Sequence, residues 1–169
     1  MTAPAWTLGL ILLAPADRPA GPDVSASYSL LRAGEADLHG VDLAGAFPFR
    51  PKWRLLADVS LHSGSFAGAH LEQTNFLAGA RRLLGAGGTW QPFAQAMLGV
   101  ARSTSRFEAS DVLIASQTSV GGSLGVGTDY RLSPHWALRG QADYLILHSS
   151  AGRDGDPRLS VGVAYRFPR

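Results

Sequence analysis

From residue 24 to residue 167, apolar and polar residues alternate with a period of two, in segments of about ten residues. The alternation is clearest in residues 158–167, where one set of alternate positions is apolar or aromatic and the other holds Arg, Ser, Gly and Ala. Successive side chains of a strand point to opposite faces, so each segment predicts a strand with one apolar and one polar face. The eight predicted strands are residues 24–32, 39–47, 53–62, 73–82, 90–102, 119–132, 136–148 and 158–167.

The connections between these segments alternate in length. Those after the second, fourth and sixth segments are short, at residues 48–52, 83–89 and 133–135. The others are longer or more polar, at residues 33–38, 63–72, 103–118 and 149–157. This layout predicts an all-β fold, an eight-stranded antiparallel up-and-down transmembrane β-barrel with short periplasmic turns and longer outer loops.

Alternation alone leaves open which face of the barrel meets water. A soluble, lipocalin-like ligand-binding barrel would place its apolar face inside. A membrane barrel would place that face toward lipid, with aromatic girdles at the two interfaces. Aromatic residues near the strand ends favour the membrane orientation, and we expect them to be interfacial: Trp53, Tyr130, Trp136, Tyr165 and Phe167.

The polar face would then line the lumen. It mixes Arg and Asp with Gly, Ala and Ser, which suits the narrow interior of an eight-stranded barrel. Charges in such an interior must pair, so we expect a plug of ion pairs rather than an ion path or a substrate-binding lumen. The expected lumen charges and polar groups are Asp42, Arg54, Asp58, His62, Arg81, Asp129, Arg131, Arg139, Asp143, Arg158 and Arg166. Within this set, we expect Asp58, Asp129 and Asp143 to pair with Arg54, Arg131 and Arg139.

Composition narrows the class of protein further. Of 169 residues, 46% are hydrophobic and 17% are charged. No stretch approaches the roughly 18–20 apolar residues of a membrane-spanning helix. The chain has no cysteine, which excludes disulfides, Cys-ligated metals and thiol nucleophiles. The net charge is +2 and no basic and aromatic residues interleave, so a nucleic acid is not an expected partner.

The first 22 residues differ from the rest of the chain. An apolar run at residues 5–13 precedes an A-x-A triplet, Ala14-Pro15-Ala16, and a Pro/Gly-rich stretch ends at Pro22. This pattern is typical of the apolar region and cleavage site of an export signal, although the basic n-region is missing. Two interpretations of residues 1–22 therefore stay open, an export signal and a disordered tail, with the barrel at residues 23–169.

Four of the short segments with a recognisable pattern are residues 91–94 (QPFA), 121–125 (GGSLG), 129–133 (DYRLS) and 160–167 (SVGVAYRF). These segments resemble the small outer-membrane β-barrel superfamily, the OmpA/OmpX-like eight-stranded barrel proteins of Gram-negative bacteria. The last segment resembles the family's C-terminal assembly signal, except that Pro168 and Arg169 follow the terminal Phe. The resemblance implies a location in the outer membrane of a Gram-negative bacterium, surrounded by outer-membrane lipid. It also implies insertion by the barrel assembly machinery.

One short motif raises the question of catalysis. His148 and Ser150 form an H-x-S pair that resembles the lipid-facing His and Ser of lipid A deacylases. In that family the motif continues with Asn-Ala-Gly and an acid follows at a fixed spacing. Here Ala151 and Gly152 follow directly, and position 162 is glycine. The chain therefore departs from the deacylase pattern, and we expect no enzymatic activity, cofactor or metal.

These observations favour a non-enzymatic outer-membrane barrel with a structural or surface-interaction role. Its partner would be a surface or envelope protein that the sequence does not identify. The alternatives are a lipid A deacylase-like membrane enzyme that uses His148 and Ser150, a small channel, and the soluble ligand-binding barrel.

Overall fold

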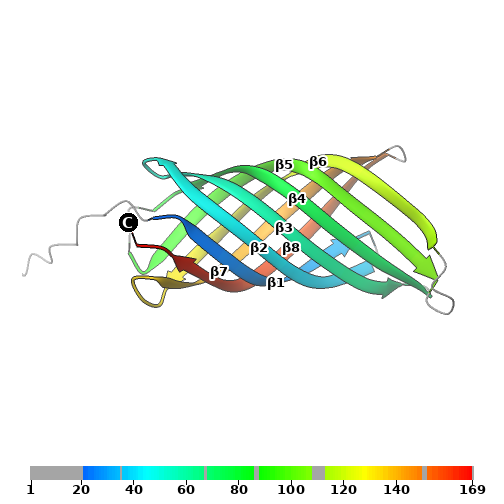
Figure 1. Cartoon of the computed structure of the whole chain (residues 1–169), viewed down its shortest axis with the longest axis horizontal. Coiled ribbons are helices and arrows are strands. Elements are labelled where there is room, and N and C mark those ends of the chain that lie inside the picture. Colours follow the sequence, from blue (N-terminus) through cyan, green and yellow to red (C-terminus); the bar gives the residue numbers. More distant parts are fainter. Residues whose placement is uncertain are drawn as a thin grey trace, which may run out of the picture.

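Every predicted strand is present in the computed structural model, which describes residues 21–34, 36–66, 68–85, 88–107, 113–149 and 152–168. The strands form one closed antiparallel barrel in which neighbours in sequence are neighbours in space (Figure 1). They are β1 (Asp23–Ala33), β2 (Ala36–Arg50), β3 (Trp53–Phe66), β4 (Ala69–Leu83), β5 (Trp90–Phe107), β6 (Leu113–Arg131), β7 (Trp136–Ser149) and β8 (Gly152–Arg166).

The barrel closes where the two ends of the described chain meet. Strand β1 pairs with β8 along its length, with Asp23 opposite Arg166. Beyond that pair, the amide of Phe167 donates a hydrogen bond to the Pro22 carbonyl over 2.9 Å. Closure gives each described strand a neighbour on both sides, which removes the unpaired edge that lipid would not tolerate. In the described part of the chain there is no helix that is long and apolar enough to span a membrane.

We call the end of the barrel that lies away from the chain ends the outer end. The connections at this outer end differ from the prediction. Most residues expected there in long loops continue the strands, so that β5 runs to Phe107 and β6 begins at Leu113. In the same way, β3 ends at Phe66 and β4 begins at Ala69. The alternation signal fades in these stretches because polar residues occupy both faces, as is usual where both sides of a strand meet water. The outer end is therefore built of extended hairpins rather than long loops.

Exposure alternates along the strands in the sense that a membrane barrel requires. Asp42 is 1% exposed, whereas Leu43, the next residue on β2, is 56% exposed. On β8, Arg158 is 0% exposed and Leu159 is 57% exposed. Charged groups therefore fill the interior and apolar groups cover the outside. The soluble, lipocalin-like alternative requires the opposite arrangement and is wrong.

Glycines on the lumen side allow the sheet to curl tightly. A β-carbon at Gly99 would lie 1.9 Å from the carbonyl oxygen of Phe76 on β4. A β-carbon at Gly121 would lie 2.1 Å from the carbonyl oxygen of Ile146 on β7. Glycine kinks of this kind bend strands where a small barrel must turn sharply. At these two positions the neighbouring backbone occupies the space that any side chain would need.

We expect Gly99→Ala to destabilise the barrel by about 1–3 kcal/mol, because backbone atoms of β4 must move to admit the methyl group. The matched control is Gly140→Ala on the outer face of β7, where a β-carbon meets nothing within 4 Å. Urea unfolding in detergent micelles measures both variants. Equal unfolding midpoints for the two variants would contradict the close approach at Gly99.

Candidate functional site

Eleven charged side chains are buried in the described part of the barrel, and one of them, Asp156, lies toward the outer end, opposite Leu145 on β7. The other ten line the lumen nearer the chain ends. Their ion pairs divide them into two clusters. We call the group nearer the chain ends the terminal cluster and the group in the middle of the barrel the central cluster. The terminal cluster consists of Asp23, Arg54, Arg81, Asp129, Arg139 and Arg166. The central cluster consists of Asp42, Asp58, Asp143 and Arg158.

Arg139 holds the terminal cluster together. Its Nε donates to Asp129 Oδ1 over 2.8 Å, and its Nη2 donates to Asp23 Oδ1 over 3.1 Å. The other oxygen of Asp129 accepts a hydrogen bond of 2.8 Å from Arg166 Nη2, and Asp23 also pairs with Arg54. Residues of five strands, β1, β3, β6, β7 and β8, thus meet at the carboxylates of Asp23 and Asp129.

Arg158 is the single cation of the central cluster. Its Nη1 lies 3.2 Å from Asp58 Oδ1 and 3.2 Å from Asp42 Oδ2. Its Nη2 lies 3.0 Å from Asp143 Oδ2. One guanidinium therefore faces three carboxylates, which come from β2, β3 and β7. A planar group with five N–H donors can serve several carboxylates at once, as a lysine ammonium cannot do in fixed directions.

A glutamine joins the two clusters. Gln95 accepts hydrogen bonds from Arg81 Nε and Nη2 over 3.0 and 2.9 Å, and its own amide donates to Asp143 Oδ1 over 2.8 Å. The terminal cluster has four arginines and two aspartates, and the central cluster has one arginine and three aspartates. The opposite excesses cancel, with five arginines against five aspartates. Neutrality of the whole set satisfies the condition under which buried charges can persist.

Toward the outer end the lumen becomes less polar. His62 Nε2 lies 2.9 Å from Ser29 Oγ, and Asn75 donates to Ser60 Oγ over 3.0 Å. Beyond them lies an apolar cluster of buried side chains. Its members are Leu31, Ala36, Leu38 and Leu145. Buried side chains therefore line the described lumen from the terminal cluster to this apolar cluster, which we call the apolar cap, and the buried Asp156 of β8 lies opposite Leu145.

The structure places the predicted lumen residues inside the barrel but pairs them differently. The expected pair of Asp129 with Arg139 forms. Asp58 and Asp143 instead share Arg158, and Arg54 pairs with Asp23. The expected pairing of Arg131 is wrong. It is half-buried at the end of β6 and forms no ion pair with another described residue.

Asp23 is an important member of the terminal cluster that the sequence pattern did not identify as a lumen residue. It lies at the first position of β1, one residue before the predicted start of the strand. The available signal was parity, since Asp23 falls on the same face as Ser25, Ser27 and Ser29. Parity gives the face of a residue. It does not give the partners across the lumen, which depend on how far each strand is shifted along the barrel axis.

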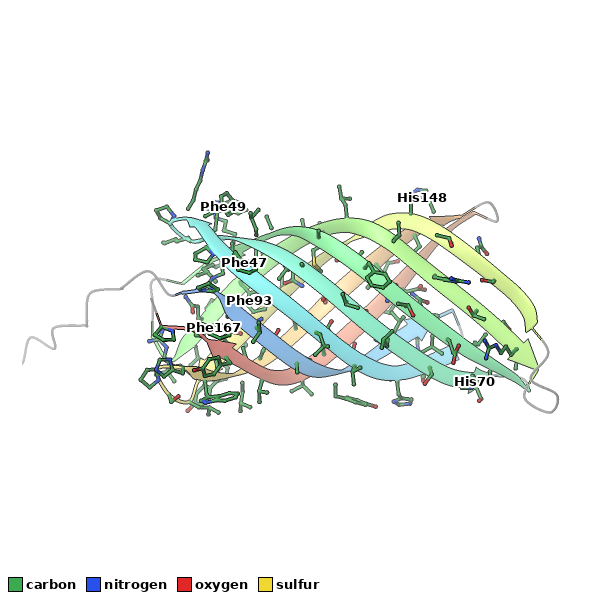
Figure 2. The ribbon with its side chains drawn as sticks, viewed as in Figure 1. Phe47, Phe49, His70, Phe93, His148 and Phe167 are labelled. Carbon is green, nitrogen blue, oxygen red and sulfur yellow. The ribbon has the colours of Figure 1, made fainter. Side chains whose placement is uncertain are left out.

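The predicted interfacial aromatic residues gather at the end where the chain ends meet. Rings of Trp136 and Tyr165 lie 4.9 Å apart between centroids, and rings of Tyr165 and Phe167 lie 5.0 Å apart. Figure 2 shows Phe47, Phe49 and Phe167 at the same end. Further members on this outer surface are Trp53, Trp90, Tyr130 and Trp136. A band of this kind is typical of the position of a membrane interface.

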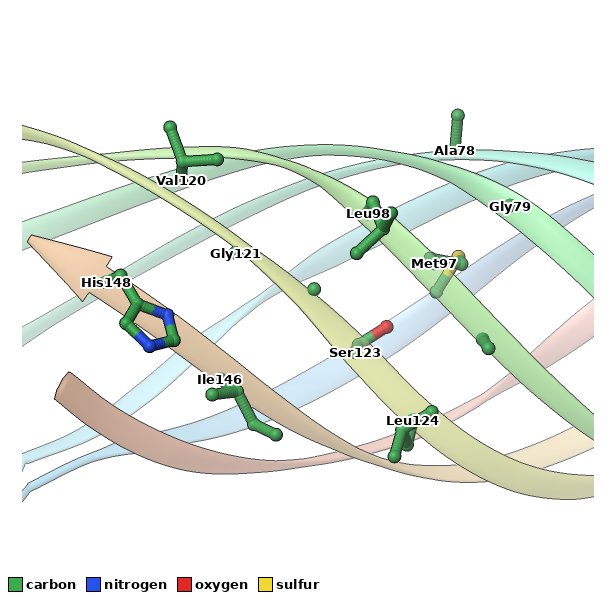
Figure 3. A pocket seen from close by; sticks show the side chains of 12 residues that line it. Ala78, Gly79, Met97, Leu98, Val120, Gly121, Ser123, Leu124, Ile146 and His148 are labelled. Carbon is green, nitrogen blue, oxygen red and sulfur yellow. The ribbon is translucent and has the colours of Figure 1, made fainter.

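The outer wall carries a groove of about 750 Å³ over β4, β5, β6 and β7 (Figure 3). The floor of the groove is formed by small residues, including Ala78, Ala96 and Gly122. Larger apolar side chains and one histidine stand around them. They are Leu98, Val120, Leu124, Ile146 and His148. The lining is almost entirely apolar, so the groove suits an apolar occupant.

His148 is exposed on this wall, the face on which the alternation along β7 places it. The other residue of the H-x-S motif, Ser150, lies outside the described residues. The ring of His148 forms no hydrogen bond with a described residue, so no acid orients it there. His62 is in the lumen and His70 is on β4, 3.8 Å from Glu72. Among described residues, no group of three or more His, Asp or Glu side chains is placed to hold a metal ion.

Comparison with known proteins agrees with this geometry. Residues 5–167 match the family model of the outer membrane protein beta-barrel domain. The chain belongs to this family, and it is a protein of the outer membrane of Gram-negative bacteria. A search of curated protein sequences finds no significant match.

Solved structures of small outer-membrane barrels share the fold. Neisserial surface protein A is 17% identical with a TM-score of 0.71, and the match covers 86% of this chain and 96% of that one. Ail, the attachment invasion locus protein of Yersinia pestis, is 13% identical with a TM-score of 0.59, covering 88% and 97%. OprG from Pseudomonas aeruginosa is 14% identical with a TM-score of 0.58, covering 89% and 97%. At these identities the likeness establishes the fold.

We expect Arg158→Met to destabilise the barrel by about 3–5 kcal/mol, because it leaves three buried carboxylates without their cation. Adding Asp58→Asn should recover part of that loss. The control is Arg32→Met, which removes an exposed pair with Asp37 and should leave the unfolding midpoint unchanged. Urea unfolding in micelles compares the three variants. If Arg158→Met matched the control, the central cluster would have no structural role.

Proposed function

We propose that this protein is a non-conducting, non-enzymatic outer-membrane barrel with a structural or surface-interaction role. In this proposal the lumen serves as a plug that stiffens the barrel, and the outer hairpins face a surface or envelope protein. Outer-membrane lipid surrounds the wall, and the barrel assembly machinery inserts the chain.

The observation that carries the proposal is the filled lumen. Eight strands leave an interior just wide enough for side chains, and here ten charged side chains, five arginines and five aspartates, form one connected network in it. An ion on this path would have to displace ion pairs such as Arg139 with Asp129. It would then meet the apolar cap around Leu31 and Leu145. Both obstacles support a barrel that does not conduct.

Strand length supports a role at the cell surface. Strands β5 and β6 have 18 and 19 residues. A membrane strand needs only about 9–11 residues to cross the bilayer. At about 3.3 Å per residue and a tilt of about 40°, the excess extends the wall by roughly 15–25 Å. The outer part of β5 is polar, with Ser103, Thr104 and Ser105 in succession, so the extension suits contact with water and with a polar partner.

The deacylase and channel alternatives receive less support. A serine nucleophile needs an adjacent base, and that base usually needs a third group to orient it. His148 forms no hydrogen bond with a described residue, and the chain lacks the acid that the deacylase pattern places after its serine. The channel alternative requires a water-filled path through the lumen, and the side chains of the plug would have to move away to open it.

The purified barrel should give no stepwise conductance in planar lipid bilayers, because the ion pairs and the apolar cap close the lumen. A general porin added to the same bilayers serves as the positive control. Conductance steps whose size changes in the Arg139→Ala variant would show that ions pass through this lumen. They would overturn the plug as the basis of the function.

Because the chain has no cysteine, single cysteines can report its orientation in cells. We expect Ser116→Cys, on the outer part of β6, to react with a membrane-impermeant maleimide on intact cells. Pro134→Cys, in the turn between β6 and β7, should react only after the outer membrane is permeabilised. The reverse pattern would place the extended hairpins in the periplasm and remove the surface role.

A further inference from the structure

The groove on the outer wall has a defined floor. Gly122 on β6 lies opposite Leu98 on β5 and opposite Ile146 on β7, so the two larger side chains flank a position that has none. Ala78 on β4 lies on the other side of Leu98, and Ala96 lies opposite Leu124. Small outward-facing residues on neighbouring strands therefore leave a depression in the outer surface of the barrel. Because the wall faces the bilayer, the space is open to lipid.

The groove ends at the outer interface of the membrane. Its outer limit is the pair of Val120 and His148, and Val120 stands ten positions before Tyr130 of the aromatic band on β6. At about 3.3 Å per residue and a tilt of about 40°, ten residues rise about 25 Å. That height equals the apolar band of an outer-membrane barrel, about 25 Å. His148 therefore lies at the level of the lipid headgroups of the outer leaflet.

A second basic side chain lies at the same end of the groove. Arg102 follows Leu98 and Val100 on the outward face of β5 and lies opposite Thr118 on β6. His148 lies opposite Val120, two positions further along β6, so the two residues stand on either side of that strand. Arg102 forms no ion pair with a described residue. Glu72 lies further out, opposite Thr104, with its carboxylate 3.8 Å from His70.

Together these features fit one ligand chemistry. In a bilayer no hydrophobic force drives a chain from lipid into an apolar groove, so retention must come from close packing and from polar contacts. A saturated acyl chain can pack against the small residues of the groove. A phosphate at its head can take charge-assisted hydrogen bonds from a guanidinium and an imidazole at the interface.

We propose that the groove over β4–β7 is a binding site for a phosphorylated lipid of the outer leaflet. One acyl chain lies against Ala78, Ala96 and Gly122, and Arg102 and His148 bind the phosphate. The site is independent of the plug, because it is on the opposite face of the strands and shares no ion pair with it.

The test is native mass spectrometry of the folded barrel, released from micelles that contain equal amounts of phosphatidic acid and a diacylglycerol with the same chains. Wild type should retain one phosphatidic acid and no diacylglycerol. Ala96→Leu fills the groove, and it should lower retention of phosphatidic acid about tenfold through lost packing. Arg102→Gln combined with His148→Gln should lower it by about tenfold and abolish the preference for phosphate.

Two matched controls lie elsewhere on the barrel. Ala26→Leu adds the same bulk to an exposed outward position on β1, and Arg32→Gln removes a basic group from the outer end of β1. Neither should change retention, and heat-modifiable gel mobility should show that all variants are folded. Equal loss in the controls and in the groove variants would overturn the site.

Three further results would also count against this proposal. Unchanged retention in Ala96→Leu would overturn the groove as the place of the chain. A dimer that dissociates in Ala96→Leu would assign the groove to a second copy of the protein. Bound lipid that loses an acyl chain in wild type but not in Ser150→Ala would make the groove a hydrolytic site rather than a holding site.

Discussion

Compensation of the charges that are buried in a narrow lumen is the constraint on which the rest of this structure depends. An eight-stranded barrel has no room to hydrate its interior charges, so each charge must be matched by others inside. Arg158 with its three carboxylates and Arg139 between Asp23 and Asp129 meet this requirement together but not separately. The connection through Gln95 makes the two clusters one network. Some of these contacts join strands that are not neighbours, such as Arg158 of β8 with Asp58 of β3 and Arg139 of β7 with Asp23 of β1, so the network also ties the barrel across its diameter.

The same narrowness governs the backbone. Curling eight strands into a small barrel brings neighbouring chains so close that Gly99 and Gly121 have no space for a side chain on the lumen side. On the outward face the constraint is absent at Gly45 and Gly140, where a β-carbon would meet nothing within 4 Å. It persists at Gly122, where a β-carbon would lie 2.5 Å from the carbonyl oxygen of Met97. The outward-facing Gly122 therefore permits a close approach of the neighbouring backbone and also shapes the wall at the groove.

The two faces also divide the possible roles of the protein. The inner face carries the buried charged side chains of the two clusters. The outer face offers two surfaces of different chemistry. One is the polar extension of the outer hairpins, which suits a partner in water, and the other is the apolar groove that ends at His148 and Arg102. Fold likeness to Neisserial surface protein A and Ail establishes the scaffold, and our two proposals assign one role to each of these surfaces.

Much of this architecture could be predicted from the sequence. Alternation specified eight strands, and the parity of Asp42, Arg54 and Arg158 placed their side chains inside, because the side-chain period of a strand is two. Aromatic residues such as Trp136 and Tyr165 were predicted to lie at one end of the barrel from their positions near strand ends, and their rings contact each other there. The extent of the outer hairpins was not predictable in this way, because strands that meet water on both faces lose their alternation. The loops expected at residues 63–72 and 103–118 are therefore mostly strand.

The sequence by itself determined which residues face the lumen and which face lipid, since local geometry decides the direction of each side chain. Only the tertiary structure decided which charges meet. Asp58 pairs with Arg158, which is 100 positions away in sequence, and Arg54 pairs with Asp23. Those partners depend on the relative shift of all eight strands around the closed barrel, a quantity to which every strand contributes. The groove has the same origin, because the relative shifts of four neighbouring strands decide which residues of its floor and walls lie opposite one another.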